Sequence, residues 1–277
     1  VHYREAELYR QNPIKAYRNC TFEGVTCYVS DDLVTWTPAG HVLTRAEIER
    51  YNPLYWMGRM GVARVGETYA MLIQLNSHLL VCEAESPAGP FRWGHEVELP
   101  ELIGASSTGD QTVFTDEDTG LSYLVCSRPG GRDHIYVCSI GRDADGRIAL
   151  TRCTDVFDGA GREGNCMFKR NGKFYLCASN LYGWDSSYAY FLVADSVHGP
   201  YRPVINPYQR PVNDSPAHVE KDMQVRLGCE NDYAHVSQTG FFVTLRSADG
   251  RELVVFCGDR WADFACNGLG YNQWVPL

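Results

Sequence analysis

The sequence predicts an all-β chain folded as a five-bladed β-propeller, with a first blade that is incomplete at the N-terminus. A Gly-x-x-Tyr motif that begins a strand occurs at Gly66, Gly120 and Gly172, at intervals of 54 and 52 residues. A Ser-x-x-Gly-Pro-aromatic motif at 86–91 returns at 196–201, 110 residues or two periods later. Intervals of about 50 residues are typical of propeller blades. Long helical periodicity is absent.

Each unit contains short β-branched and aromatic runs between turn residues, such as Tyr69–Leu75 and His134–Ile140, which predict strands. A further unit at 250–257 follows an interval of 78 residues, stretched by a polar insertion around 202–234. A partial unit occupies 24–33. One period before Gly66 lies near residue 12, which has no strand pattern, so we expect the inner part of the first blade to precede Val1.

A short helical segment is expected at 44–50, where Thr44 stands as an N-cap before good helix formers. We expect it to decorate a loop. No linker interrupts residues 1–277, and undivided all-β domains of this length are common, so a single propeller domain is predicted. The innermost strand of each blade lines the central channel, which places the functional residues at one rim.

The net charge of −9 and the pI near 5.4 argue against nucleic acid or an anionic membrane as a partner. Such polyanions are held by clustered Lys and Arg, which this chain lacks. The sequence also has no run of 18 or more apolar residues that would predict a membrane span. A neutral ligand fits this composition better.

Most of the eleven cysteines lie inside predicted strands, where a free thiol behaves as a small apolar side chain. The odd count and the lack of closely spaced pairs favour reduced core thiols over a disulfide framework or a metal site. A bridge between Cys153 and Cys166 is left open. The expected core thiols are Cys82, Cys126, Cys138, Cys177 and Cys257.

Several segments in a fixed order span nearly the whole chain: 24–36, 56–63, 109–120, 163–176 with Gly183-Trp184, 237–239 and 258–261. Together they resemble glycoside hydrolase family 43, the five-bladed propeller hydrolases of plant and microbial glycans. The similarity is greatest to the arabinofuranosidase and galactan-cleaving branches.

This resemblance implies that Glu163 is a general acid and that Asp110 raises its pKa by like-charge repulsion. An inverting glycosidase needs such an acid, and a base carboxylate roughly 6.5–9.5 Å away. Asp110 lies 53 residues upstream of Glu163, one blade earlier. Two plainer interpretations stay open: Asp110 as a turn former bonded to its own backbone, and Glu163 as a loop charge paired with Arg162. The acidic residues 116–118 are expected at a solvent-facing hairpin tip.

The general base is not recognisable, because the family's first-blade aspartate has no counterpart here. Gln238 matches a position where a glutamine takes part in some galactan-cleaving relatives. Its amide can orient water or bind sugar but cannot act as a conventional base. Gly58 stands before Arg59 where such relatives have an acidic residue, so one expected sugar contact is missing.

Sugar recognition is expected from aromatic platforms and planar hydrogen-bonding groups on the matched segments. The alternatives are core packing for the tryptophans, an ion pair with Asp259 for Arg260, and a buried structural imidazole for His235. The predicted platforms are Trp56, Trp184 and Trp261, and the predicted polar partners are Arg59, Arg260, His235 and Gln238.

The function predicted from the sequence is an inverting, exo-acting glycoside hydrolase that releases arabinofuranosyl or galactosyl units from plant-type polysaccharide or arabinogalactan side chains. The expected partner is an oligo- or polysaccharide, with no cofactor and no metal. Two alternatives remain: a glycan-binding propeller without a base, and a protein-interaction propeller, which would expose apolar patches. The substrate class favours a secreted or periplasmic protein, whereas unpaired cysteines suit the cytoplasm.

Overall fold

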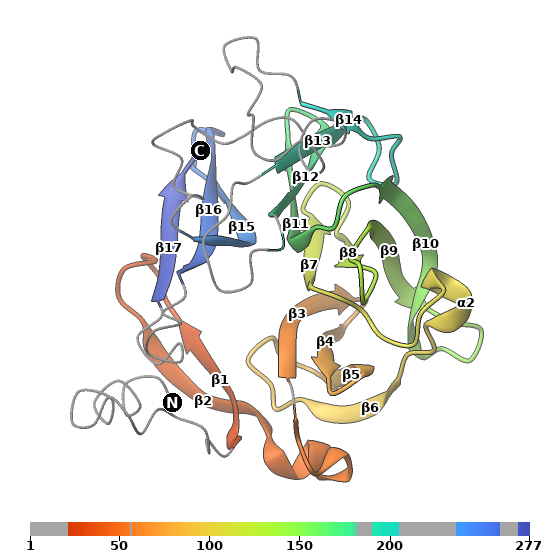
Figure 1. Ribbon diagram of the computed structural model, residues 1–277. Helices are drawn as coiled ribbons and strands as arrows, with labels where there is room; N and C mark the ends of the chain where they lie inside the picture. The colour runs from red at the N-terminus through yellow and green to blue at the C-terminus, as the bar shows by residue number, and fades with distance from the viewer. Residues whose placement is uncertain (1–21, 56, 180, 182–189, 205–236, 261–270) are drawn as a thin grey trace, which may run out of the picture.

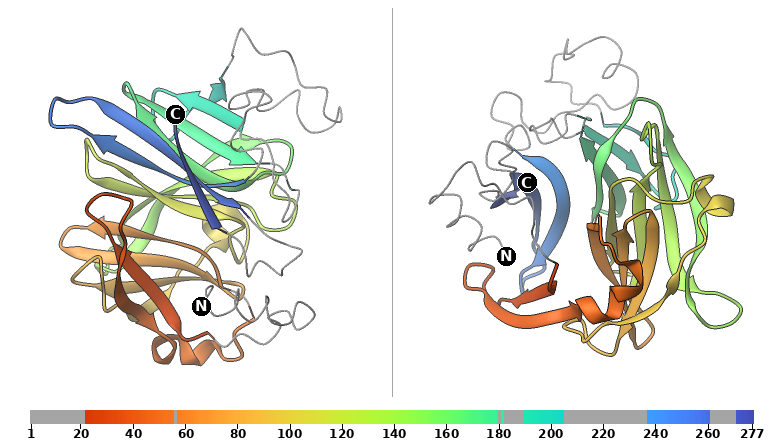
Figure 2. Two further views of the ribbon diagram at one scale, coloured as in Figure 1. Left: turned by 90° about the vertical axis from the view of Figure 1, so that its left-hand side faces the viewer. Right: turned by 60° about the horizontal axis from the view of Figure 1, so that its bottom comes forward.

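Five antiparallel sheets stand around a central axis in the computed structural model (Figure 1). The structure describes residues 22–55, 57–179, 181, 190–204, 237–260 and 271–277. It confirms the predicted all-β propeller. Figure 2 shows the sheets from two further sides, with the strands twisted as expected for β-structure. No helix in these described residues is long and apolar enough to cross a membrane.

Each sheet is a meander whose strands pair in chain order. The first sheet contains β1 (Gly24–Val29) and β2 (Thr37–Thr44), and the second contains β3 (Met57–Val65), β4 (Thr68–Leu75), β5 (His78–Ala84) and β6 (Arg92–Glu96). The third contains β7 (Gln111–Asp116), β8 (Leu121–Ser127), β9 (His134–Arg142) and β10 (Ile148–Asp158). The fourth contains β11 (Glu163–Arg170), β12 (Lys173–Ser179), β13 (Tyr190–Ala194) and β14 (Arg202–Pro203), and the fifth contains β15 (Gln238–Arg246), β16 (Glu252–Arg260) and β17 (Tyr271–Pro276).

The first strand of each of the second to fifth sheets lies nearest the axis (Figure 1). Neighbouring inner strands contact one another, β3 with β7, β7 with β11 and β11 with β15. These strands are equivalent members of a repeated unit and therefore begin at the same end of the ring. Residues at their starts consequently gather at one rim, even when they lie more than 50 residues apart in sequence.

The repeated glycines form the turn between the first and second strands of each complete unit. Gly66, Gly120, Gly172 and Gly250 have φ of 65°, 70°, 73° and 82°. This left-handed region costs other residues about 1–2 kcal/mol. The second motif also recurs as one turn, because Gly89 and Gly199 donate to the carbonyls of Ser86 and Ser196. The sequence period therefore matches the structural one.

Apolar side chains fill the spaces between successive sheets. One buried cluster joins the first and second sheets, another the second and third, and two more continue the series to the fifth. Leu72 and Leu124, for example, are almost completely buried and belong to the cluster between the second and third sheets. Full burial of such a side chain stabilises the fold by about 1.5–3 kcal/mol.

Short helical segments lie at the periphery of the ring. Residues 45–51 form η1 (Arg45–Tyr51), a 3₁₀ helix in which the Thr44 side chain makes no capping hydrogen bond. A second short helix, α2 (Pro100–Ile103), lies outside the ring and contacts β10 (Figure 1). The first sheet has two strands in the described part of the chain. The segment near residue 12 lies outside the described residues.

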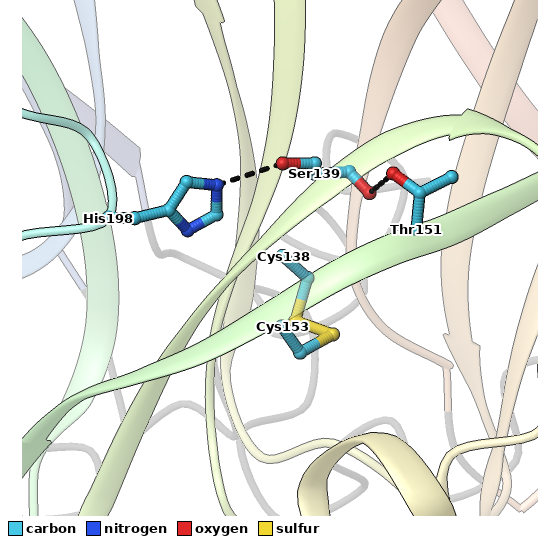
Figure 3. The surroundings of a disulfide bond; sticks show 5 residues. All are labelled: Cys138, Ser139, Thr151, Cys153 and His198. Carbon is cyan, nitrogen blue, oxygen red and sulfur yellow. Dashed lines mark hydrogen bonds between the residues drawn. A yellow bond between two sulfur atoms is a disulfide. The ribbon is translucent and has the colours of Figure 1, made fainter.

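One cysteine prediction is wrong, because Cys138 forms a disulfide with Cys153 (Figure 3). The two residues are direct partners in the pairing of β9 with β10, with their Cα atoms 4.0 Å apart. The sequence pattern identified the strands but not this register. Cys166 is free, so the bridge left open between Cys153 and Cys166 does not form. Figure 3 also shows Ser139 Oγ 2.9 Å from His198 Nε2, a contact between the third and fourth sheets.

The remaining predicted core thiols are buried and form no disulfide, as expected: Cys82, Cys126, Cys177 and Cys257. Burial raises the pKa of Cys82, Cys126 and Cys257 to about 12, with smaller contributions from neighbouring negative groups at Cys82 and Cys257. Inert apolar packing is therefore the role of these thiols near neutral pH.

The acidic tip at 116–118 does not face solvent throughout, because Asp116 is buried and binds a cation from the next blade. Lys169 Nζ on β11 lies 2.8 Å from Asp116 Oδ1 and 2.8 Å from Asp118 Oδ2. Arg246, at the end of β15, lies 3.2 Å from Asp118 Oδ1. The tip therefore links the third, fourth and fifth sheets at the end of the inner strands away from Glu163.

Candidate active site

Four inner strands bring polar side chains to one rim of the propeller. Arg59 lies near the start of β3, and Asp110 directly precedes β7. Glu163 and Gln238 are the first residues of β11 and β15. Hydrogen bonds and ion pairs join these residues into one cluster, so the structure brings together four residues that the sequence singled out.

Irregular pairing at the starts of three inner strands shapes this rim. The register shifts between Met57 and Met60 in β3, between Glu163 and Cys166 in β11, and between Thr239 and Phe241 in β15. A bulge bends its strand and re-aims the side chains beside it, and bulges are common next to active sites. Arg59 and Glu163 both lie within or beside such a bulge.

Gly164 is the residue that permits the bulge of β11. Its φ is 62°, and a Cβ there would lie 2.3 Å from Thr239 Oγ1 and 2.5 Å from Thr239 O. Thr239 Oγ1 donates a 2.6 Å hydrogen bond to Gly164 O, so the fourth and fifth sheets approach closely at this point. The Glu163 carbonyl is held from its own sheet by Ser179 Oγ at 3.1 Å.

Asp110 is bonded to the next blade and to two arginines. The Gly164 amide donates to Asp110 Oδ2 at 2.9 Å, and the Asn165 side chain donates to the Asp110 carbonyl at 3.2 Å. Arg59 Nε lies 3.5 Å from Oδ2, and Arg132 Nη1 lies 3.6 Å from Oδ1. These contacts tie Asp110 to the Glu163 strand, in contrast to the self-contained turn of the plainer interpretation.

Glu163 is a buried carboxyl beside a cation. Its side chain is 11% exposed, and Oε2 lies 3.1 Å from Arg132 Nη1. Oε1 is buried and has no hydrogen-bond partner among the described residues. Arg162, the partner suggested by the plainer interpretation, places its guanidinium over the Tyr190 ring at 4.8 Å from the centroid.

Burial raises the pKa of Glu163 to about 7, and the nearby charge of Asp110 adds to the rise. Arg132, Arg59 and a hydrogen bond from Gln238 act in the opposite direction, but they do not offset it. A carboxyl with this pKa is protonated in a large fraction of molecules near neutral pH and can lose its proton readily. These are the properties of a general acid.

Arg59 connects three blades at the rim. Beyond its contact with Asp110, its Nη2 lies 3.2 Å from Asp259 Oδ2, 3.0 Å from the Thr239 carbonyl and 3.5 Å from Gln238 Oε1. Burial raises the pKa of Asp259, Arg59 lowers it and Asp110 raises it further. Arg59 is thus committed largely to holding the two aspartates and the start of β15 in place.

The cluster balances its charges when Glu163 is protonated. Three carboxyl groups, Asp110, Glu163 and Asp259, share the two guanidiniums of Arg59 and Arg132. With both aspartates ionised and Glu163 protonated, two negative charges face two positive ones. Loss of the Glu163 proton leaves one net negative charge, which would attract a cationic transition state.

Sequence reasoning missed Arg132 and Asp259 as site residues. Arg132 lies in the loop between β8 and β9, outside any recognised motif. Asp259 pairs directly with Gln238 across β16 and β15, so its place beside the site follows from strand register. The repeat could have suggested Asp259, because it shares the rim with Gln238; no sequence signal identified Arg132.

Several predicted sugar contacts cannot be placed. Trp56, Trp184, His235 and Trp261 lie outside the described residues. Arg260 is the last residue of β16, and its side chain is likewise outside the description. Within the described ranges, no group of three or more His, Cys, Asp and Glu side chains could hold a metal ion.

The model of the glycosyl hydrolases family 43 matches residues 14–227. This chain belongs to family 43. A beta-xylosidase of Formosa agariphila is 24% identical over 169 residues, which is 55% of this family 43 chain and 28% of the relative. A Xylanibacter ruminicola protein, provisionally named a beta-xylosidase, is 27% identical over 190 residues, or 64% and 33% of the two chains. The chain thus matches about a third of the length of these curated relatives.

Solved structures with the same fold include a galactanase and a galactosidase. An exo-beta-1,3-galactanase of Clostridium thermocellum superposes with a TM-score of 0.73 at 22% identity, covering 95% of this chain and 55% of that one. A family 43 beta-1,3-galactosidase with bound galactodeoxynojirimycin gives a TM-score of 0.72 at 21% identity, covering 94% and 84%. These likenesses establish the propeller fold of the family 43 chain.

Proposed function

We propose that this family 43 chain is an inverting, exo-acting glycoside hydrolase with Glu163 as general acid. The observation that carries the proposal is the buried Glu163 carboxyl, with a pKa of about 7, held between Asp110 and Arg132 at the rim. The proposed substrates are galactosyl or arabinofuranosyl units at the ends of plant-type polysaccharide or arabinogalactan side chains. An exo-beta-1,3-galactanase and a beta-1,3-galactosidase among the structural neighbours support the first choice.

In the proposed reaction, Glu163 donates its proton to the glycosidic oxygen as the bond from that oxygen to the anomeric carbon breaks. Water adds its oxygen to the opposite face of that carbon and gives up a proton to a base. Asp110 raises the pKa of Glu163 through its charge, and its bond from the Gly164 amide fixes the two carboxyls relative to one another. The released alcohol carries the proton that Glu163 supplied.

We assign Gln238 to sugar binding or to orientation of the attacking water. It lies at the start of β15, and its Oε1 is 3.5 Å from Arg59 Nη2, within the cluster that holds Glu163. A glutamine amide cannot take the water's proton at neutral pH, so it assists a base rather than replacing one. Full activity in Gln238→Ala would remove this assignment.

A second candidate is a propeller that binds glycan without cutting it. The contacts of Asp110 and Asp259 with arginines favour it, because a carboxylate oxygen that already faces a guanidinium is not free to accept a proton from an attacking water. Under this candidate the rim would bind the same sugars. The tryptophans at 56, 184 and 261, with His235 and Arg260, remain proposed sugar contacts in either case.

The test is hydrolysis of nitrophenyl galactopyranoside, galactofuranoside, arabinofuranoside and xyloside by wild type, Glu163→Gln and Glu67→Gln. Glu67 is a matched control, since its side chain is 94% exposed in the turn before β4. Activity on one sugar should fall by about 10²–10⁴-fold in Glu163→Gln and persist in Glu67→Gln. Sugar binding without turnover in wild type would favour the binding propeller, and neither binding nor turnover would overturn both candidates.

A further inference from the structure

Arg132 bridges the two proposed catalytic carboxyls with one nitrogen. Its Nη1 lies 3.1 Å from Glu163 Oε2 and 3.6 Å from Asp110 Oδ1, and its side chain is 29% exposed. The residue comes from the loop between β8 and β9, whereas Asp110 precedes β7 and Glu163 opens β11. Arg132 therefore reaches from the third sheet to the acid on the fourth.

The backbone around Arg132 is fixed at several points. Arg132 has φ of 53°, in the left-handed region, and its carbonyl accepts a 2.8 Å hydrogen bond from the Arg162 amide. Arg128 and Asp133 flank it and form a two-point ion pair at 3.1 and 2.6 Å. Asp133 also accepts a backbone hydrogen bond from Gly159. The loop is thus built to hold this guanidinium at a set position.

A guanidinium has donors only, so the oxygen that faces it must accept a hydrogen bond whether or not Glu163 is protonated. Oε2 is that oxygen. A hydroxyl oxygen accepts a hydrogen bond more weakly than a carbonyl oxygen, so the contact with Arg132 favours the proton on Oε1, which is buried and has no hydrogen-bond partner among the described residues. The two oxygens of Glu163 are therefore chemically distinct before any substrate binds.

We propose that Arg132 is a positioning residue that confines the transferable proton to Oε1 of Glu163 and faces the carboxylate formed after transfer. This inference rests on the proposed role of Glu163 as general acid. The proton passes from Oε1 to the glycosidic oxygen while the carbon–oxygen bond breaks. The electron pair of the O–H bond stays on Glu163, whose new negative charge then lies beside Arg132, and solvent restores the proton after product release.

Within the described part of the chain, the charged groups that shift the pKa of Glu163 most belong to this same cluster. Asp110 favours the protonated acid, while Arg59 and Arg132 favour the carboxylate, as does the Gln238 amide. Asp259 contacts Arg59 and belongs to the cluster through this ion pair. Removing Arg132 therefore removes the nearest cation, and both the midpoint of the Glu163 titration and the alkaline limb of kcat/KM should move to higher pH.

The experiment compares wild type with Arg132→Met, Arg132→Lys and Arg64→Met. Arg64 is the matched control, an exposed arginine on β3 that pairs with Glu67 away from the rim. The Glu163 carboxyl is followed by ¹³C NMR of protein labelled at glutamate, with Glu163→Gln identifying the signal. In Arg132→Met the midpoint should rise by about one pH unit. Arg132→Lys should keep the midpoint close to wild type, and Arg64→Met should not move it.

The kinetic arm measures kcat/KM against pH and against the pKa of the leaving group. Loss of Arg132 should slow the hydrolysis of substrates with poor leaving groups more than that of nitrophenyl glycosides. A poor leaving group depends more on protonation of the glycosidic oxygen. An unchanged Glu163 midpoint in Arg132→Met, or in Arg132→Gln should the first variant not fold, overturns the inference. A shifted midpoint in a protein that hydrolyses no glycoside overturns the catalytic role and the proposed function, while the hydrogen-bond assignment at Oε2 stands.

Discussion

Burial raises the pKa of Glu163, the proposed general acid, and makes this carboxyl a cost to the stability of the fold above neutral pH. Its carboxyl has a pKa of about 7 in the fold, against 4.5 for the unperturbed group. The folded state therefore binds more protons than the unfolded chain between these values, so its stability falls as pH rises through them. The proposed general acid thus carries a measurable stability signature.

We expect Glu163→Gln to match wild type in stability near pH 4.5 and to exceed it at pH 8. The stabilisation that comes from the raised pKa is fully present below about pH 4.5 and is lost as the pH rises through about 7. Gln resembles the protonated acid at every pH, so the variant does not lose this stabilisation. The difference at pH 8 should reach at most about 3 kcal/mol. Urea denaturation at several pH values measures it; parallel pH curves for the two proteins would contradict the raised pKa.

At the scale of the element, the bulge that opens β11 depends on Gly164. The strand aims Glu163 into the rim because its pairing shifts between Glu163 and Cys166. Gly164 combines a left-handed φ with close contact to Thr239, and the hydrogen bond from its amide to Asp110 fixes the modulator. One small residue therefore controls both the inner strand of the fourth sheet and its link to the third sheet.

Gly164→Ala should destabilise the protein by roughly 3 kcal/mol or more, because backbone strain and a clash with the Thr239 carbonyl act together. Gly172→Ala is the matched control. Its φ is 73°, but a Cβ there would meet nothing within 4 Å, so only the strain of about 1–2 kcal/mol applies. Equal losses in chemical denaturation would show that the close approach to Thr239 does not matter.

Across the whole molecule, the inner strands are joined at both ends by charges. Arg59, Asp110 and Arg132 link the blades at the proposed catalytic rim. At the far end, Lys169 and Arg246 join the acidic tip of the third blade to the fourth and fifth. The ion pairs of Lys169 and Arg246 with the acidic tip therefore form a charged clamp at the end of the ring away from the site. This clamp is separate from the residues proposed for chemistry.

Lys169→Met should destabilise the ring by roughly 2–4 kcal/mol, since it leaves the buried Asp116 carboxylate without its cation. Lys173→Met is the control on the neighbouring strand, where the partner Asp195 is 80% exposed and solvent screens the pair, so little loss of stability is expected. Thermal unfolding measures both. A Tm for Lys169→Met as close to wild type as that of Lys173→Met would argue against the clamp.

The local pattern of residues was sufficient for the fold class, the turns and the strands. Repeated glycines specify left-handed turns wherever they occur, and β-branched runs between them form strands in any register. Glu163 and Asp110 were identified from their shared place in the repeat and from the family resemblance. Their meeting at one rim follows from the equivalence of the inner strands.

Only the tertiary structure decides which side chains meet between neighbouring blades and between paired strands. Arg132 reaches Glu163 from a loop without a motif, Asp259 joins the site as the strand partner of Gln238, and Cys138 bonds to Cys153 because the two strands align them. Asp116 is buried because Lys169 of the next blade neutralises it. A sequence lists the groups that can interact, but the distances that set burial, pairing and pKa exist only after the ring has formed.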